Sequence, residues 1–353
     1  MEKQITIIIP TYNMEKYIGR CLDSLLIPEI DMVEVLVVND GSKDRSSEIA
    51  HNYAERYPDS IRVIDKPNGN YGSCINAALP QAMGRYVRIL DADDIFDTES
   101  FSSFVKKLPN INTDLVITEY REYQADGSIK HVKPYFDTVP EYGSSIDVNN
   151  SEIMSGEHFI KMHRMSYKTD LIRRIDYRQT EGISYTDTEW AVIPLYHCKN
   201  FTCLDIIVYH YFLGREGQTV SPEKISKSIN QLVTVFFRLI DFYNDYPTDS
   251  PLKKSLFIMT YYRLEFLCFT AMKYWDGSIA EMFKDFDYRL KSKNNDLYRS
   301  LNNIYYDEGM RFKFIKDIRN KNYPQSYSIP LWCRVSLSFK IRFGLFRKKF
   351  LSK

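Results

Sequence analysis

The chain has 353 residues, of which 44% are hydrophobic and 26% are charged, a composition typical of a globular protein. This length predicts one large domain with a smaller one, or two domains. The formal net charge of +1 gives no sign of the basic surface that nucleic-acid-binding proteins use, so nucleic acid is excluded as an expected partner.

Strand and helix patterns alternate through the first hundred residues. Apolar, β-branched runs predict strands at 5–9, 33–38, 61–64 and 87–90, and amphipathic periodicity predicts helices at 16–26, 44–57 and 73–83. Continuous apolar strands separated by helices are typical of a parallel sheet covered on both faces. The predicted fold class is therefore α/β, with a Rossmann-like, mostly parallel central sheet.

The secondary-structure pattern of the sequence changes at about residue 111 and again after residue 221. Residues 111–210 give a mixed pattern, with strand-like segments at 115–118 and 206–212. The sequence after residue 221 is mainly helical, with long helices predicted in 221–246 and 251–275. We therefore expect an α/β domain in residues 1–220 and a helical C-terminal region in residues 221–353.

Cysteine usage and hydropathy indicate a cytoplasmic protein. The six cysteines are scattered and form no Cys-x-x-Cys pair, which favours reduced thiols over a disulfide framework or a zinc site. The N-terminus has no secretion-signal pattern, and no segment reaches the roughly 20 apolar residues that a membrane-spanning helix needs.

The last 23 residues, 331–353, contain seven Lys or Arg residues, no acidic residue, and interleaved aromatic side chains. Such a stretch suits an anionic membrane surface, which would bring the protein to the inner face of the cell membrane. An amphipathic terminal helix docked on its own protein explains the same pattern equally well, so both interpretations stay open.

Four polar clusters follow the predicted strands, each at the carboxyl end of its strand. They are residues 11–13, 39–42, 66–72 and 91–94. In open parallel sheets, ligands bind beyond the carboxyl ends of the strands, so this edge is the predicted binding site.

The cluster at 91–94 has the clearest chemistry, because Asp91, Asp93 and Asp94 come directly after an apolar run. On an extended chain, residues i and i+2 point the same way, which predicts that Asp91 and Asp93 converge. Two carboxylates at a strand end suit Mg²⁺ or Mn²⁺ and leave coordination positions for phosphate oxygens. An acidic, solvated turn is the alternative for an isolated motif of this kind.

Three motifs together resemble those of the GT-A family 2 glycosyltransferases. They are Thr-Ile-Ile-Ile-Pro-Thr-Tyr-Asn at 6–13, Val-Val-Asn-Asp-Gly-Ser at 37–42 and Leu-Asp-Ala-Asp-Asp at 90–94. The resemblance is close over about residues 3–100 and looser as far as about residue 220. Members of that family are inverting enzymes that use a nucleotide-diphosphate sugar, so the resemblance implies a GT-A fold, a UDP-sugar donor and a divalent metal.

The resemblance also implies roles for single residues at the donor site. Asp40 would accept a hydrogen bond from the N3–H of uracil, although a plain turn residue is the alternative. The other expected donor-binding positions are Pro10, Thr11 and Tyr12 beside the base and ribose, Asn68 and Gly72 in a loop that approaches the nucleotide, Asp91 and Ala92 in the acidic motif, and Arg215 at the diphosphate.

The metal implied by the resemblance is expected to bind Asp91 and Asp93, with Asp93 the more direct ligand and Asp94 orienting a neighbour. His210 begins a segment, 210–218, that resembles the family's flexible closing loop, and it is a further candidate ligand. A structural role is the commoner one for a lone histidine, and His163 is expected to be a surface or packing residue.

An inverting transfer needs a base that takes the proton of the acceptor hydroxyl during attack. The segment Gly-Ile-Ser-Tyr-Thr-Asp-Thr-Glu-Trp at 182–190 resembles the family's acceptor-side motif, a Glu-Asp pair followed by an aromatic residue. Thr186 stands where Glu is usual, so Asp187 is the expected base and Glu189 the second candidate. A capped helix start is the structural alternative for this cluster.

The resemblance predicts transfer of a sugar from a UDP-sugar to a hydroxyl of a cell-surface polysaccharide or a lipid-linked saccharide. Two other functions fit parts of the pattern: a sugar-phosphate nucleotidyltransferase, and a non-catalytic module of the same fold that binds nucleotide or carbohydrate. The segment 10–13, Pro-Thr-Tyr-Asn, argues against the nucleotidyltransferase, which usually has a Gly-rich loop there. A homodimer built by the helical region is left open.

Overall fold

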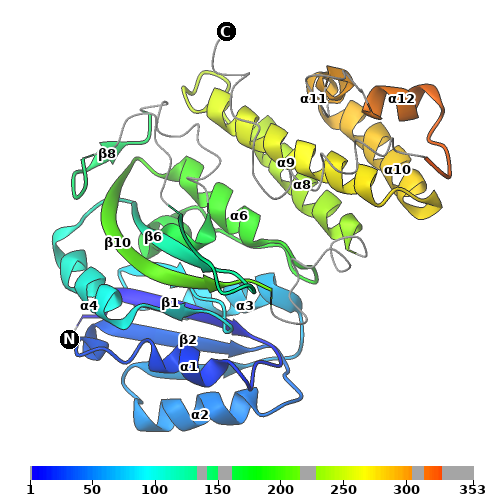
Figure 1. Cartoon of the computed structure of the whole chain (residues 1–353). Coiled ribbons are helices and arrows are strands. Elements are labelled where there is room, and N and C mark those ends of the chain that lie inside the picture. Colours follow the sequence, from blue (N-terminus) through cyan, green and yellow to red (C-terminus); the bar gives the residue numbers. More distant parts are fainter. Residues whose placement is uncertain (1, 133–140, 150–160, 215–227, 304–313, 328–353) are drawn as a thin grey trace. The chain divides into compact units, whose positions relative to one another are not determined.

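The computed structural model describes residues 2–132, 141–149, 161–214, 228–303 and 314–327 (Figure 1). Arg215 and the basic segment 331–353 lie outside the described residues. The chain divides into two compact units. Unit 1 comprises Met1–Ser221 with Pro247–Leu256, and unit 2 comprises Pro222–Tyr246 with Phe257–Lys353.

Unit 1 is built on one mixed sheet. Its strands are β1 (Ile5–Thr11), β2 (Val33–Asn39), β3 (Ile61–Asp65), β4 (Tyr86–Ile89), β5 (Ile95–Phe96), β6 (Leu115–Tyr123), β7 (Ile129–Val132), β8 (Ile146–Asp147), β9 (Met165–Lys168) and β10 (Asn200–Phe212). Across the sheet the order is β3-β2-β1-β4-β9-β6-β10-β5, with β7 beside β6 and β8 beside β10.

The first four strands form the parallel half that the sequence predicts. β1 pairs with β2 and β4, and β2 pairs with β3, all in parallel. Every residue of β2 is buried, as expected for a strand covered on both faces. The spatial order reverses at β1, between β2 and β4, and such a switch point is where open α/β sheets bind ligands.

The second half of the sheet is more antiparallel than the first. β9 runs antiparallel to β4 and β6, while the long strand β10 is parallel to β6 and antiparallel to β5. The pairing of β10 with β5 holds Tyr209 and His210 beside residues 95–96, directly after the acidic motif. The α/β, mostly parallel prediction is confirmed, and β10 is the strand that brings the later sequence to the predicted site.

Helices cover the sheet on both sides. α1 (Ile18–Asp23), α2 (Ser46–Arg56) and α4 (Thr98–Lys107) contribute to one hydrophobic core with the inward residues of β1 and β2. α3 (Asn70–Ala78) packs against β1 and β2 through residues outside that core. It begins three residues earlier than predicted, because Asp40 accepts hydrogen bonds from the backbone N–H groups of Gly69 and Asn70 at its start. The remaining helices of the unit are α5 (Thr169–Arg174) and α6 (Asp187–Val192).

Unit 2 is helical and has its own hydrophobic core. Its helices are α8 (Ile229–Asp245), most of α9 (Lys253–Lys273), α10 (Gly277–Lys293), α11 (Asn295–Ser300) and α12 (Phe314–Asn320). Inside this core, the fully buried Asp287 pairs with Arg319 and accepts a hydrogen bond from Tyr323. Removing one partner of a buried ion pair costs several kcal/mol, so this pair fixes α12 on α10.

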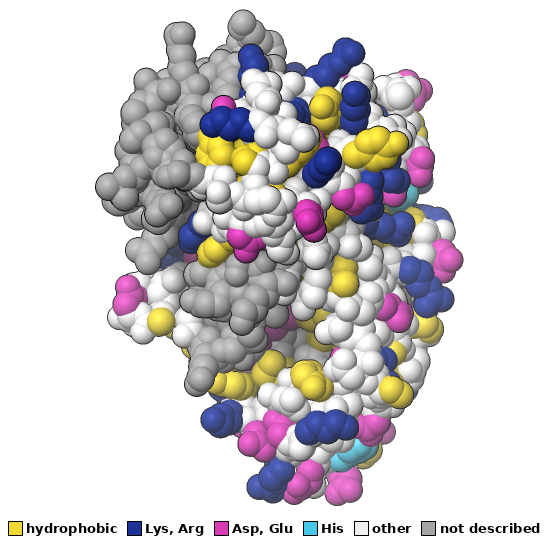
Figure 2. Space-filling view, turned by 90° about the vertical axis from the view of Figure 1, so that its right-hand side faces the viewer, with side chains coloured by type: hydrophobic (Ala, Val, Ile, Leu, Met, Phe, Trp, Pro, Cys, Tyr) yellow, Lys and Arg dark blue, Asp and Glu magenta, His cyan; other side chains and the backbone are white. Residues whose placement is uncertain are grey.

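On the face shown in Figure 2, basic and acidic side chains are interspersed and the hydrophobic side chains form separate small groups. Among the described residues, no helix is long and apolar enough to cross a membrane. The five cysteines that the structure describes are buried and free of disulfide bonds.

Candidate active site

The loops that follow β1 and β2 are joined by side-chain hydrogen bonds. Asn13, at a φ of 54°, accepts a hydrogen bond from the backbone N–H of Lys43, and its own N–H donates to Ser42. These bonds fix the carboxyl edge of the parallel strands, where Thr11 is buried and Tyr12 is 46% exposed. An exposed aromatic ring at this edge is free to stack on a nucleobase.

Asp40, at the end of β2, is buried and fully hydrogen-bonded. One carboxylate oxygen accepts from the Lys66 ammonium at 2.6 Å and from the Gly69 N–H at 2.9 Å. The other accepts from the Asn68 amide at 3.0 Å and from the Asn70 N–H at 2.9 Å. A carboxylate offers about four acceptor positions, and all are used here to hold the loop before α3. The predicted contact between Asp40 and uracil stays a prediction, and it requires one of these donors to move.

Gly72 has a packing role that the sequence did not indicate. A Cβ built on Gly72 would lie 2.0 Å from the backbone oxygen of Thr180. The absent side chain therefore lets α3 approach the segment that leads to α6. Close approach of Gly72 to a nucleotide, as the sequence predicts, stays a prediction.

We expect Gly72→Ala to lower the melting temperature of the protein, because the clash is with backbone and overpacking costs about 1–3 kcal/mol even where side chains can move. Gly19→Ala is the matched control: Gly19 lies in helix α1, and its Cβ would be 3.9 Å from the Tyr53 hydroxyl of α2, an ordinary van der Waals contact. Differential scanning calorimetry of both variants measures the difference. Equal melting temperatures would show that α3 does not need this close approach.

Asp91 and Asp94 are brought together by a tight turn. The Asp94 N–H donates to the Asp91 carbonyl at 3.0 Å, closing the turn after β4. The Asp91 carboxylate accepts a hydrogen bond from the Tyr71 hydroxyl at 2.8 Å. The Asp94 carboxylate accepts from the Tyr209 hydroxyl at 2.7 Å and from the Phe212 N–H at 2.8 Å. Helix α3 thus holds the Asp91 carboxylate, and strand β10 holds the Asp94 carboxylate.

His163 completes a group of metal-ligating side chains with Asp91 and Asp94. One donor atom from each of the three residues lies within 4.8 Å of the others. His163 is buried, stacks against Tyr120 and Tyr211, and its Nδ1 has no hydrogen-bond partner among the described residues. A buried, unpaired imidazole nitrogen beside two carboxylates is the donor set expected of a cation site.

Burial governs the protonation of this group. It lowers the pKa of His163 to about 3, with smaller contributions from the positive charges of Lys161, Arg164 and Arg88. The imidazole is therefore neutral and able to ligate. Burial, with the negative charges of Asp93 and Asp91, raises the pKa of Asp94 well above its usual range. A cation would relieve this repulsion among carboxylates.

The other two predicted metal ligands, Asp93 and His210, are not part of this group. Asp93 is buried, and its carbonyl accepts a hydrogen bond from Arg20, but its carboxylate is not part of the three-residue group. His210 contacts Tyr123 and faces Asp97, with 4.0 Å between its Nε2 and the carboxylate. The candidate group at Asp91 is thus formed with Asp94 and His163, and metal binding by Asp93 and His210 stays a prediction. Ala92 is buried in the same turn.

Asp187 and Glu189 have different environments on α6. Asp187 is the exposed first residue of the helix, and Glu189 is buried and accepts a hydrogen bond from the Thr180 N–H at 2.9 Å. Burial first, and then the negative charges of Asp94, Asp91, Asp187 and Asp93, raise the pKa of Tyr211. The charge of Asp187 thus acts on Tyr211 together with the charges of the acidic turn, although 93 residues separate Asp187 from Asp94 in the sequence.

Comparison with known sequences agrees with these motifs. Residues 6–172 match the family model described as glycosyl transferase family 2. The uncharacterized glycosyltransferase EpsJ of Bacillus subtilis is 28% identical over 262 residues, which cover 71% of this chain and 73% of EpsJ. The chain spans a smaller share, 44%, of two mycoplasmal glycosyltransferases that it also resembles.

Solved structures share the fold. TarS 1–349 of S. aureus, crystallised with UDP-GlcNAc, has a TM-score of 0.53 at 18% identity, covering 93% of this chain and 95% of that chain. The mannosyltransferase PcManGT from Pyrobaculum calidifontis, in complex with GDP-Man and Mn²⁺, has a TM-score of 0.50 at 16% identity, covering 98% and 88%. Residues 6–172 therefore match the family 2 glycosyltransferases, and the sequence relatives and the GT-A-like sheet agree with that match.

Proposed function

We propose that the protein transfers a sugar, with inversion, from a UDP-sugar to a hydroxyl of a cell-surface polysaccharide or a lipid-linked saccharide. The observation that carries this proposal is the group of Asp91, Asp94 and His163 at the carboxyl edge of the sheet, together with Asp187, whose charge contributes with those of Asp94 and Asp91 to raising the pKa of Tyr211. A metal-ligating group next to an exposed carboxylate supplies the two functions that such a transfer needs: neutralisation of a leaving diphosphate and removal of a proton from the acceptor.

The residues present fit a divalent cation. Asp91, Asp94 and His163 would hold it, with Asp93 close by as a further negative charge. Mg²⁺ takes oxygen ligands, so a set that includes imidazole favours Mn²⁺ over Mg²⁺. When bound, the cation would stabilise the negative charge that develops on the departing UDP.

Asp187 is the proposed base. It is exposed at the start of α6, so an acceptor hydroxyl can reach it. Glu189 is buried and holds the backbone of Thr180, so we assign it a structural role in supporting α6.

The donor and acceptor classes rest on the family and on its relatives. TarS binds UDP-GlcNAc and PcManGT binds GDP-Man with Mn²⁺, which supports a nucleotide-sugar donor here. In this proposal residues 1–220 carry the reaction, with Pro10, Thr11, Tyr12 and Asn68 near the nucleotide. The proposed lipid-linked acceptor and the contact with the inner membrane face depend on segment 331–353. The proposed contact with the diphosphate depends on Arg215 in the closing loop. Neither segment 331–353 nor Arg215 lies within the described residues.

We expect Mn²⁺ and UDP to stabilise the protein together more than either does alone, because ligand that binds the native state raises its stability by RT ln(1 + [L]/Kd). A thermal-shift screen of UDP, GDP and a panel of UDP-sugars, with and without Mn²⁺, measures this. The sugar that gives the largest shift is then assayed for Mn²⁺-dependent UDP release. A protein that binds UDP-sugar without turnover would be a binding module, and one that ignores UDP would contradict the proposal.

A further inference from the structure

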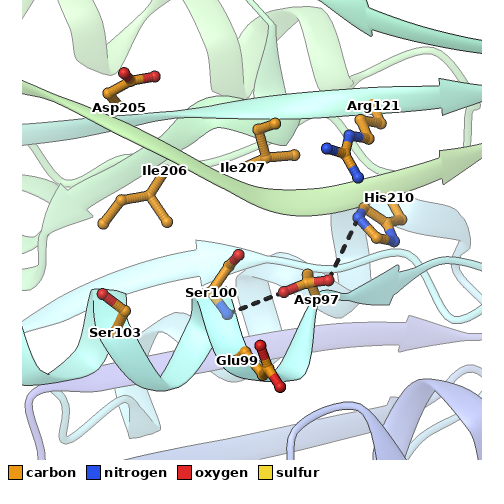
Figure 3. A pocket seen from close by; sticks show the side chains of 9 residues that line it. All are labelled: Asp97, Glu99, Ser100, Ser103, Arg121, Asp205, Ile206, Ile207 and His210. Atoms are coloured by element: carbon orange, nitrogen blue, oxygen red, sulfur yellow. Dashed lines mark hydrogen bonds and ion pairs between the residues drawn. The ribbon is translucent and has the colours of Figure 1, made fainter.

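A polar pocket of about 410 Å³ lies between α4 and strands β6 and β10 (Figure 3). Its volume is within the range of small-ligand sites. The nine residues that line it are Asp97, Glu99, Ser100, Ser103, Arg121, Asp205, Ile206, Ile207 and His210. None of them belongs to the group of Asp91, Asp94 and His163, so the pocket is separate from the candidate metal centre.

The His210 Nε2 and the Arg121 guanidinium, both in the pocket, make no hydrogen bond in the part of the chain that the structure describes. His210 is buried, with 7% of its surface exposed, and its Nε2 makes no hydrogen bond. Asp97 Oδ2 faces this nitrogen at 4.0 Å, too far for a hydrogen bond. Arg121 lies on the same side of the pocket as His210 (Figure 3), and its guanidinium forms no hydrogen bond or salt bridge with the described residues. Buried polar groups normally have partners, so the buried His210 Nε2 indicates a ligand, and the half-buried Arg121 guanidinium beside it offers further donors.

The charges around the pocket restrict which classes of ligand it could bind. Three carboxylates, those of Asp97, Glu99 and Asp205, outnumber the single guanidinium of Arg121, which disfavours an anion such as phosphate. The only group of three metal-ligating side chains found among the described residues is the one at Asp91, so a bound metal ion is not supported here.

A neutral molecule with many hydroxyl groups suits this lining. Each hydroxyl donates one hydrogen bond and accepts others, so it can bond both to carboxylates and to the guanidinium and imidazole N–H groups. Ser100 and Ser103, on α4, add two hydroxyls, and Ile206 and Ile207 give apolar surface for the C–H face of a sugar ring. Ser100 and Ser103 project from α4, and Ile206 and Ile207 lie where the register between β10 and β6 shifts.

We propose that this pocket binds a neutral saccharide unit of the acceptor glycan, away from the unit that reacts. The proposal rests on the proposed function for the identity of the glycan. The pocket and the candidate active site share β10: Tyr209 and Phe212 hold Asp94, and His210 between them lines the pocket. A second sugar site so close to the first raises the effective concentration of acceptor at the reaction centre.

Isoleucine methyl NMR of the full chain tests the proposal, because Ile206 and Ile207 report on the pocket directly. The probes are β-linked di- to tetrasaccharides of glucose, galactose and N-acetylglucosamine, added in the presence of saturating UDP and Mn²⁺ so that the donor site is filled. We expect saturable shifts of the Ile206 and Ile207 methyl signals. Inorganic phosphate is titrated separately, and shifts of these signals by phosphate alone would overturn the proposal, as would no shift with any saccharide.

Two variants and one control localise the binding. Arg121→Met is expected to weaken saccharide binding about tenfold or more, as loss of a hydrogen bond to a charged group does. Ser103→Trp, on the exposed side of α4, fills the pocket without disturbing buried contacts and should abolish the shifts. Lys107→Met removes one positive charge from the same helix outside the pocket and should change nothing.

UDP release measured on the same samples separates this proposal from the proposed function. Saccharide shifts that persist in a preparation without UDP release would support the pocket and count against sugar transfer. UDP release in a protein whose Ile206 and Ile207 signals never respond would reject the pocket alone.

Discussion

Replacing Asp187 with Asn is expected to lower kcat for UDP release by about 10²–10⁴-fold, the range that general-base catalysis contributes. Asn keeps the shape of the side chain and the start of α6 but cannot take a proton from water or from an acceptor hydroxyl. KM for the UDP-sugar should change little, because Asp187 acts on the acceptor side. The acid limb of the kcat–pH profile, which reports titration of the base, should disappear in the variant.

Asp170→Asn is the matched control for this experiment. Asp170 is also an exposed carboxylate in the first turn of a short helix, α5, so the substitution makes the same change of charge and helix capping. Its UDP release should equal that of the unchanged protein. Glu189→Gln should chiefly lower thermal stability, since Glu189 is buried against the Thr180 N–H. Full activity in Asp187→Asn with loss in Glu189→Gln would transfer the role of base to Glu189.

The sequence was sufficient to predict the parallel half of the sheet. The apolar-rich runs at 5–9, 33–38, 61–64 and 87–90 became β1 to β4, because strands covered on both faces bury mostly apolar side chains. β2 and β4 are buried throughout, whereas β3, at the end of the strand order, is only partly buried. The polar clusters lie at the carboxyl ends of these strands, as the topology of such sheets requires. The short antiparallel strands carry no comparable pattern, since β5 and β8 have two residues each.

The candidate group of Asp91 and Asp94 at the acidic turn could not be derived from the local sequence, because it depends on where the strand stops. The spacing of Asp91 and Asp93 brings them together only on an extended chain, but β4 ends at Ile89 and the chain turns. The hydrogen bond from Asp94 to Asp91 closes that turn, so its first and last residues meet. An Asp-Ala-Asp-Asp sequence is compatible with both geometries.

The histidines illustrate the limits of local patterns. His210 lies on β10 between Tyr209 and Tyr211, and successive side chains of a strand point to opposite faces. Tyr209 contacts Asp94, so His210 faces away from it. His163 reaches the carboxylates only because β9 inserts between β4 and β6, a long-range pairing that no spacing in the sequence indicates.

Removal of the His163 imidazole is expected to weaken Mn²⁺ binding in the presence of UDP by at least about 10–100-fold, the loss that even an outer-shell partner of a metal causes. Asp91→Asn and Asp94→Asn should have larger effects, because each removes a charged oxygen ligand. Isothermal titration calorimetry of Mn²⁺ into the UDP-bound protein measures all three. UDP release should fall in parallel, since without the cation the charge on the departing nucleotide is poorly compensated.

The variants His163→Gln and His210→Gln discriminate between the two ligand sets. Both replace a buried histidine by an amide of similar size, so their effects on stability, measured by calorimetry, can be compared directly. If the group of Asp91, Asp94 and His163 holds the metal, His210→Gln should leave the Mn²⁺ affinity within about twofold, because a residue outside the ligand set and its hydrogen-bond partners has little influence on it. The opposite pattern, with Mn²⁺ affinity lost in His210→Gln and kept in His163→Gln, would mean that the turn at 91–94 and strand β10 rearrange when the metal binds. In that case, Asp93→Asn tests whether residues 91–93 have become extended. Only on an extended chain does Asp93, and not Asp94, lie beside Asp91.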